Sequence, residues 1–213
     1  MTTLSPEAQS VNNVSFTSKQ IDILEAYLEL GLKQGVAGIT LQKMATILKL
    51  SLGTIHYHFG GKKNHGLLDS ALIYVSQESF KYVSFSIEQK ESTSSFNGMN
   101  TYINTLFDWA QIKQHHSLFW IYYFYLSTYD EKSRRFNQAY LDLVHQRIRA
   151  MIMMGQKKGL YPKFTIKQSL VDQLFAQLMG SLLLASHDPT KENFARQEKV
   201  AIEGCDKMIK ALS

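Results

Sequence analysis

The residues best suited to chemistry lie between Leu30 and Leu68, and the chemistry that they suit is the binding of a phosphate backbone. This stretch contains no Asp or Glu, and its lysines are Lys33, Lys43, Lys49, Lys62 and Lys63. The formal net charge of the whole chain is only +5, which by itself indicates no partner. A local excess of positive charge, by contrast, is what a nucleic-acid surface requires.

The stretches 40–48 and 51–57 predict two short helices joined by a tight turn. Each carries apolar residues at helical spacing that can hold it against the rest of a domain. These residues are Leu41, Met44, Ala45 and Leu48 in the first stretch, and Leu50, Ile55 and Phe59 in and beside the second. Ser51 is a natural N-cap, and Gly53 with Thr54 keeps the second helix slim enough for a major groove about 12 Å wide. The second helix is therefore the predicted recognition helix of a helix-turn-helix.

This region resembles the signature of the tetracycline-repressor (TetR) family of transcription regulators. That signature reads approximately Thr, apolar, x, x, Ile/Met-Ala, then Ser-x-Gly-Thr-Ile-Tyr-x-His-Phe-x-x-Lys. The matching residues, in register, are Met44, Ala45, Ser51, Gly53, Thr54, Ile55, His58, Phe59 and Lys62. A weaker match, to the family's Gly-x-x-x-Gly-x-Phe/Tyr segment, occurs at 155–161. His56 stands where the family usually has Tyr, with Tyr57 beside it, which moves the aromatic contact by one residue.

The resemblance implies which residues contact duplex DNA. Thr40, at a helix N-terminus, and Lys62 would hold phosphates, because free N–H groups and a lysine charge attract an anion without reading sequence. The residues implied to face the groove are Ser51, Leu52, Thr54, His56 and Tyr57. Thr54 could contact a thymine methyl group and His56 could donate to guanine. The alternative is that Thr40 is only an N-cap and Lys62 only a solvated charge.

The whole chain is predicted to be all-α, because apolar residues recur at three- and four-residue spacing and only three prolines occur. The first helix begins after Thr17, which forms a capping box with Gln20. Further helices are expected at 40–48 and 51–57, then a longer one that carries apolar residues from Leu67 to Val83, and others at 99–113, 117–127, 131–158, 166–186 and 193–212. We expect two domains: a tail and three-helix DNA-binding domain at 1–65, and a larger helical effector-binding and dimerisation domain at 66–213.

The segment 118–126 is apolar or aromatic all the way round, so its helix must be enclosed by others. It is either plain core or the wall of a cavity for a small-molecule effector, which the family resemblance favours. The candidate pocket residues are Trp109, His116, Trp120, Tyr123, Phe124, Met151 and Met154. For the two methionines the alternative role is packing in the core. For His116, together with His115, the alternative is that the pair only starts a helix.

An apolar stripe in the last two helices suggests a dimer interface. It consists of Leu170, Leu174, Leu178 and Leu182, continued by Met208. In the TetR family these two helices from each subunit form a four-helix interface, and a twofold dimer presents two recognition helices to half-sites about 34 Å apart. The alternative is that the stripe is core within one chain.

Other classes of function find little support. The single cysteine, Cys205, suits a reducing cytoplasm, and no export signal or membrane-spanning run is evident. No cofactor or metal is expected, since His56 and His58 diverge on a helix and no phosphate loop or hydrolase elbow occurs. A helical-bundle enzyme would have only Asp142 and His145 as a partial di-metal motif.

The sequence thus predicts a cytoplasmic, homodimeric bacterial transcription regulator that is not an enzyme. We expect a repressor that binds a palindromic operator in double-stranded DNA and leaves it when a small molecule binds. A DNA-binding regulator without a small-molecule ligand has the same N-terminal residues and stays as the alternative.

Overall fold

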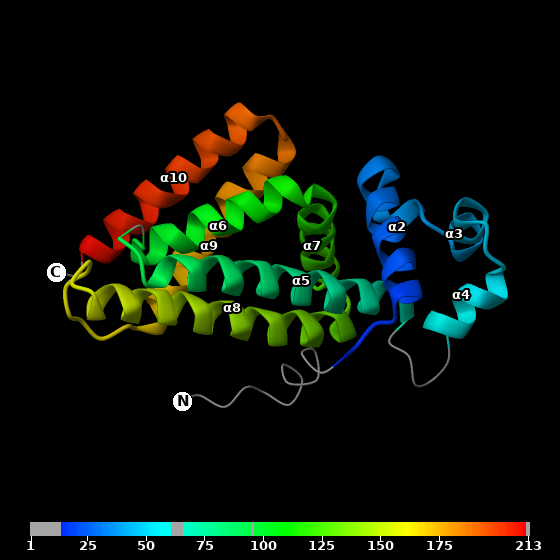
Figure 1. Ribbon diagram of the computed structural model, residues 1–213, viewed down its shortest axis with the longest axis horizontal. Coiled ribbons are helices and arrows are strands. Elements are labelled where there is room, and N and C mark those ends of the chain that lie inside the picture. Colours follow the sequence, from blue (N-terminus) through cyan, green and yellow to red (C-terminus); the bar gives the residue numbers. More distant parts are fainter. Residues whose placement is uncertain (1–13, 61–65, 95, 212–213) are drawn as a thin grey trace. The chain divides into compact units, whose positions relative to one another are not determined.

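The computed structural model describes residues 14–60, 66–94 and 96–211. In this part of the chain every regular element is helical and no strand occurs, so the all-α prediction is confirmed. Figure 1 shows the helices in chain order. They are α2 (Ser18–Gln34), the 3-10 turn η1 (Val36–Gly38), α3 (Leu41–Leu48), α4 (Leu52–Phe59), α5 (Gly66–Glu91), α6 (Gly98–Ile112), α7 (Gln114–Leu126), α8 (Glu131–Lys157), α9 (Gln168–His187) and α10 (Lys191–Lys210).

The predicted start of α2 is confirmed in detail. Thr17 is its N-cap: the Thr17 Oγ1 accepts from Gln20 N at 3.3 Å, and Gln20 Oε1 accepts from Thr17 N at 2.9 Å. These two bonds satisfy donors that a helix N-terminus otherwise leaves unpaired. Gly35 ends the helix at a φ of 80°, which a residue with a Cβ rarely adopts.

For the helices after residue 40 whose two ends were both predicted, the ends lie within two residues of the prediction, except at α7. That helix begins at Gln114, three residues before the expected Ser117. Only Lys113 separates it from α6, so the polar Gln114-His115-His116 run is its first turn and not a loop. Contacts of both histidines with α2, described below, give this turn partners that the local sequence does not reveal.

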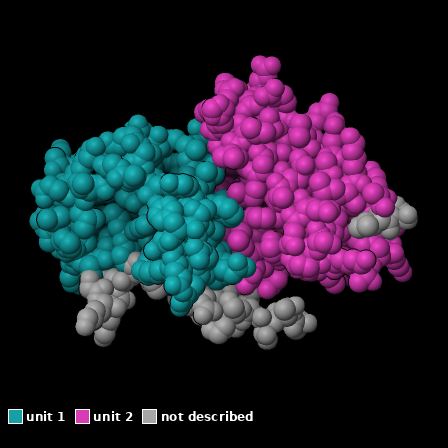
Figure 2. Space-filling model, turned by 180° about the vertical axis from the view of Figure 1, so that it is seen from behind, with its two compact units in different colours: residues 1–78, 114–139 teal, residues 79–113, 140–213 magenta. Residues whose placement is uncertain are grey.

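The chain folds into two compact units (Figure 2). Unit 1 contains residues 1–78 and 114–139, and unit 2 contains residues 79–113 and 140–213. The boundaries fall inside α5 and α8, so each of these long helices belongs partly to each unit. Unit 1 includes α7 because that helix packs on α2, and the expected domain boundary after residue 65 stays a prediction.

The core of unit 1 is made by α2, α3, α4, α7 and the first half of α5. Helix α2 packs on both α3 and α7. On the α7 side the rings of Tyr27 and Phe119 meet edge to face with centroids 6.0 Å apart. On the other side Met44 and Ile55 are fully buried. The helix-turn-helix is thus one layer of a larger packed unit, which fixes its shape.

In unit 2 the helices α6, α9 and α10 pack on one another (Figure 1). Phe107 of α6 and Phe194 of α10 meet edge to face at 6.4 Å. Helix α9 is long and apolar enough to cross a membrane by length and composition alone. Its Leu174 side chain is nevertheless fully buried against this helical core, as in the central helix of a globular unit.

The segment 155–161, which includes the end of α8, packs against the start of α6. Gly159 turns the chain at a φ of 74° after α8. Tyr161 then inserts its buried ring beside Gly155 and Gly98, where a Cβ at either glycine would lie within 3 Å of the ring. The Tyr161 hydroxyl accepts from the backbone N–H of Met99 at 2.8 Å. This packing explains why glycines precede the aromatic residue at this spacing.

Candidate nucleic-acid interface

Side-chain caps fix both short helices of the helix-turn-helix. Thr40 Oγ1 accepts from Lys43 N at 3.2 Å at the start of α3, and Ser51 Oγ accepts from Thr54 N at 2.9 Å at the start of α4. Between them Lys49 adopts the left-handed conformation, with φ 54° and ψ 40°. Leu50 N donates to Ala45 O at 2.9 Å, which closes the turn. The relative direction of the two helices is therefore set by local hydrogen bonds.

The opposite faces of α4 differ sharply. Ile55 and Phe59 are buried in unit 1, and Gln20 Nε2 donates to the His58 carbonyl at 3.3 Å, which ties the C-terminal end of α4 to α2. The outward face carries the residues expected to face the groove. Of these, Ser51, Leu52, His56 and Tyr57 are exposed and Thr54 is half-buried. The structure thus brings all five to one helix.

Tyr57 is the most exposed of the large apolar and aromatic side chains among the described residues, with 81% of its surface accessible. Its ring meets the His58 ring edge to face, with centroids 5.2 Å apart. An aromatic side chain held in solvent by a capped and packed helix is free to contact a partner with its ring and its hydroxyl. Sequence and structure therefore agree that α4 presents an aromatic group one residue after the position usual in the family signature.

The charge around this face is positive. Lys43 donates to Gln34, and Lys33 and Lys49 are exposed. Thr40, whose hydroxyl caps α3, is exposed at the same helix N-terminus, where free N–H groups suit a phosphate. Lys62, the other predicted phosphate contact, lies outside the described residues.

The predicted pocket residues are brought together only in part. His116, Trp120, Tyr123 and Phe124 belong to unit 1, whereas Trp109, Met151 and Met154 belong to unit 2. Within unit 1, Trp120 and Phe124 are neighbours with ring centroids 5.9 Å apart, and the buried His116 faces Glu25. All of them except Phe124 and Met154 are buried. Which of them contact an effector stays a prediction.

Sequence reasoning missed Arg147, a half-buried charged residue of α8 in unit 2. Its guanidinium lies over the Phe80 ring at 4.4 Å and donates to Ser84 Oγ at 2.7 Å. Burial lowers the pKa of this guanidinium. The contacts of this half-buried arginine thus include a hydroxyl and a ring face. The signal in the sequence was a single arginine on an otherwise apolar helix face.

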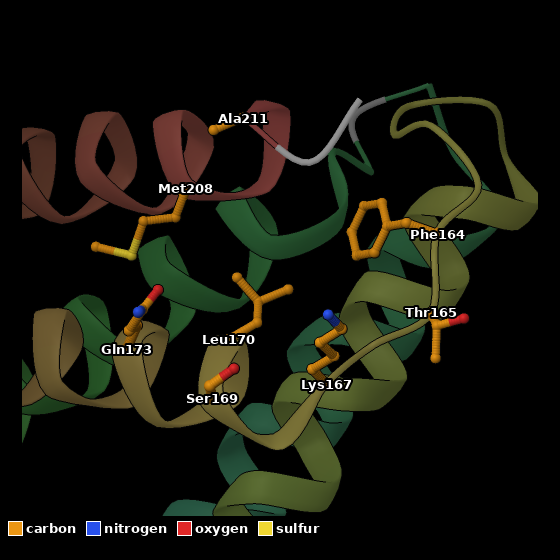
Figure 3. A pocket seen from close by; sticks show the side chains of 8 residues that line it. All are labelled: Phe164, Thr165, Lys167, Ser169, Leu170, Gln173, Met208 and Ala211. Atoms are coloured by element: carbon orange, nitrogen blue, oxygen red, sulfur yellow. The ribbon is translucent and has the colours of Figure 1, made fainter.

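A surface pocket of about 590 Å³ lies in unit 2 between the start of α9 and the end of α10 (Figure 3). Phe164, Lys167 and Gln173 lie around it, and Leu170 and Met208 approach from the two helices. Leu170 and Met208 are residues that the sequence assigned to the dimer interface. None of the predicted effector residues lines this pocket.

The apolar stripe predicted for dimerisation is mostly core within one chain. Leu170, Leu174 and Leu178 are only 5%, 0% and 2% exposed, and Leu182 and Met208 are half-buried. The exposed apolar residues of these helices are instead Leu183, Leu184 and Val200, at 51%, 54% and 45%. Periodicity identified an apolar face correctly, but α6 and α10 of the same chain cover it.

The pair that suggested an enzyme, Asp142 and His145, forms no multidentate site in the described residues. His145 stacks edge-on against Phe175 at 5.2 Å, and neither residue belongs to a group of three or more close metal-ligating side chains there. The same holds for His56 and His58. The geometry therefore offers no observation in favour of the enzyme alternative.

Comparison with solved structures identifies the fold. The chain is similar to a TetR transcription regulator from Haloarcula marismortui, with a TM-score of 0.72 and 18% identity over 91% of this chain and 100% of that one. It is also similar to a transcriptional regulator from Saccharomonospora viridis in complex with choline, with a TM-score of 0.71 and 20% identity over 88% and 95% of the two chains.

A further similar structure is the fatty acid degradation regulator FadR from Bacillus halodurans, with a TM-score of 0.67 and 16% identity over 90% of this chain and 97% of that one. No family model and no curated protein sequence matches the chain. The fold of this chain is that of the TetR transcription regulators, with an N-terminal helix-turn-helix.

Proposed function

We propose that this chain is a TetR-family transcription regulator that inserts α4 into the major groove of DNA. The observation that carries the proposal is the outward face of α4. It holds Ser51, Thr54, His56 and Tyr57 on a capped, packed helix, in a stretch of sequence with lysines and no acidic residue. Such a face combines groups that read base edges with a surrounding charge that attracts phosphates.

The two kinds of contact have separate roles. Thr40 at the N-terminus of α3 and Lys62 hold the phosphate backbone, which sets the register of α4 in the groove. Thr54 and His56 then contact base edges, and Tyr57 contacts a base or sugar beside them. Because phosphate binding releases counterions, affinity falls steeply with salt.

The regulator acts as a homodimer on a palindromic operator. A twofold dimer matches two half-sites about 34 Å apart, and a single α4 of eight residues reads too few base pairs for useful specificity. The residues that we propose for the contact between copies are Leu183, Leu184 and Val200, which replace the buried part of the predicted stripe. They lie on α9 and α10, the two helices that the family resemblance assigns to dimerisation.

A small molecule releases this repressor from its operator. The similar structure with bound choline supports a ligand-binding role for this fold. In this chain Arg147 would hold a negatively charged group of the effector, because a counter-charge would relieve the cost of its burial. Helix α5 begins at the end of the helix-turn-helix and runs into unit 2, so an effector there can act through it. Coupling of about 1–3 kcal/mol would weaken DNA binding about 5- to 150-fold.

The decisive experiment selects duplexes from a random-sequence DNA library with the purified full chain. Affinity for the enriched duplex is then measured at two salt concentrations for the wild type and for Tyr57→Ala. Tyr129→Ala is the matched control, since Tyr129 is also a highly exposed tyrosine of unit 1 outside the helix-turn-helix. We expect a twofold-symmetric site, affinity that falls with salt, and a loss of about tenfold or more for Tyr57→Ala alone. No enrichment at low salt would refute the proposal.

A further inference from the structure

Three metal-ligating side chains meet in unit 1 although they are far apart in sequence. Glu25 lies in the middle of α2, and His115 with His116 lies in the first turn of α7. Glu25 Oε2 is 2.9 Å from His115 Nε2 and 3.3 Å from His116 Nε2. One ligand atom from each residue can be chosen so that all three lie within 4.8 Å of one another. Both imidazoles therefore aim at the same carboxylate oxygen.

The other carboxylate oxygen is already held. Tyr74 of α5 donates its hydroxyl to Glu25 Oε1 at 2.6 Å, and its ring meets the His116 ring edge to face at 5.6 Å. Hydrogen bonds from His115 and His116, and the weaker one from Tyr74, keep the pKa of Glu25 well below its usual range. The Tyr74 hydroxyl thus orients the carboxylate, as hydrogen bonds to ligating groups do in known metal sites.

The distances suit a transition metal. Zn²⁺ lies about 2.0–2.2 Å from imidazole nitrogen and carboxylate oxygen, so the ligand atoms of a tetrahedral site are about 3.3 Å apart. The two N–O separations, 2.9 and 3.3 Å, are at or below this value. Small side-chain movements would admit the ion once each imidazole presents an Nε2 lone pair in place of its hydrogen bond to Glu25, with the displaced protons released to solvent. The His116 side chain is fully buried, whereas the His115 and Glu25 side chains are 15% and 25% exposed. An ion can therefore approach past Glu25 and His115.

We propose that Glu25, His115 and His116 bind one divalent transition-metal ion of the zinc class, with water as the fourth ligand. Two imidazoles and one carboxylate, without a thiolate, suit Zn²⁺, Ni²⁺ or Co²⁺ better than Ca²⁺ or Mg²⁺, which prefer oxygen ligands alone. The sequence-based expectation of no metal rested on the divergence of His56 and His58 and did not consider this trio, since 90 residues separate His115 from Glu25.

The site also has a regulatory consequence, which rests on the proposed function. Its ligands come from α2, which packs directly on α3 of the helix-turn-helix, and from α7. A bound ion would clamp α2 to α7 and so change the freedom of the DNA-binding helices. Metal occupancy is therefore a second signal to the regulator, separate from a small molecule at Arg147.

The test uses the full chain after removal of metal with a chelator. Co²⁺ is titrated while visible absorption is recorded, and Zn²⁺ is added to displace it. We expect the intense absorption of tetrahedral Co²⁺ to saturate at one ion per chain, and Zn²⁺ to raise the melting temperature. Absence of both effects in the wild type overturns the proposal, whatever the variants do.

Variants assign the ligands. Glu25→Gln keeps the size of the side chain and a carbonyl acceptor for Tyr74, and His115→Asn changes a partly exposed position. Each should weaken Co²⁺ binding more than 100-fold, and Tyr74→Phe should weaken it about 10- to 100-fold, as loss of an outer-shell partner does. His187→Ala, at the exposed end of α9, should change nothing. Unchanged binding in folded Glu25→Gln and His115→Asn overturns the assignment.

DNA affinity with and without Zn²⁺ tests the regulatory part separately. We expect the wild type to change its affinity at least about fivefold and His115→Asn not to respond. An unchanged wild-type affinity overturns the regulatory role while the spectroscopic site stands. If the chain binds no DNA in either state, the proposed function has failed and the metal site is judged by its absorption alone.

Discussion

At the scale of single residues, a few side chains determine what the surface of this protein can do. Tyr57 projects from α4 into solvent, whereas Ile55, two residues earlier, is fully buried. The hydroxyls of Thr40 and Ser51 accept hydrogen bonds from backbone N–H groups, which fixes the starts of α3 and α4. Function at this scale depends on which side of a short helix each residue lies.

Lys49 carries a conformational cost that a substitution can relieve. It is the residue with a Cβ that has positive φ in the described part of the chain, and it ends α3. Lys49→Gly should stabilise the protein by about 0.5–1 kcal/mol, since glycine has no left-handed penalty, and Lys49→Val should destabilise it. Denaturant unfolding measures both. Equal stability of the two variants would contradict the left-handed turn.

Cys205 should be chemically inert in the native protein. Burial raises the pKa of its thiol to about 12, with a smaller contribution from Asp206. The reactive thiolate is therefore scarce at neutral pH. We expect no labelling by a thiol reagent until guanidinium unfolds the chain. The control is Ser94→Cys, in an exposed loop. The new thiol should be labelled at once in the native state, while Cys205 in the same chain stays unlabelled.

At the scale of elements, the sequence pattern at 155–161 indicated a close contact between the end of α8 and the start of α6. Tyr161 fills the space left by the glycines at 98 and 155 and accepts a hydrogen bond from Met99 N. A Cβ at Gly155 would approach the Tyr161 ring to 2.3 Å. The Gly-x-x-x-Gly-x-Tyr pattern is thus a packing motif of unit 2 and needs no ligand to explain it.

This packing predicts that the effect of a substitution at Gly155 on stability depends strongly on the residue at position 161. Gly155→Ala should destabilise the protein by about 1–3 kcal/mol through overpacking against Tyr161. In a Tyr161→Ala background the same substitution should be neutral or stabilise by up to about 1 kcal/mol, because alanine favours a helix and the ring is gone. Urea unfolding of the four proteins in this cycle measures the coupling. Additive effects would show that the ring and the glycine do not touch.

At the scale of the whole molecule, the proposed function involves two copies of the chain. The exposed positions Leu183, Leu184 and Val200 are apolar on helices whose other faces are buried, which leaves a surface that a second copy would cover. The stripe predicted from sequence lies mainly on the buried side. We therefore expect the interface on the exposed face of α9 and α10, and not on the buried face where the periodicity of apolar residues placed it.

Leu184→Glu should make the protein monomeric. A carboxylate in the centre of an apolar interface would lose its hydration without a partner, so the dimer would dissociate while each chain stays folded. Sedimentation equilibrium measures the oligomeric state, and DNA binding to one and two half-sites measures the consequence. Ile112→Glu, at another exposed apolar position outside α9 and α10, should remain dimeric. A dimeric Leu184→Glu protein would place the interface elsewhere.

The sequence alone determined the features that depend on near neighbours along the chain. The all-α fold, the Thr17–Gln20 capping box and the caps at Thr40 and Ser51 follow from residues three or four positions apart, which must meet in a helix. Helix ends were predictable for the same reason, and α7 escaped because the partners of its first turn lie in α2.

Tertiary structure decided what covers each apolar face and which distant polar groups meet. Periodicity showed that Leu174 and Leu178 share an apolar face, but not that α6 and α10 of the same chain bury it. It suggested one aromatic pocket, whose residues the fold divides between two units. Glu25, His115 and His116 have no signature in sequence, because their meeting depends on the packing of α2 against α7. Contacts between distant segments come from the whole set of packed surfaces, and no local pattern encodes that set.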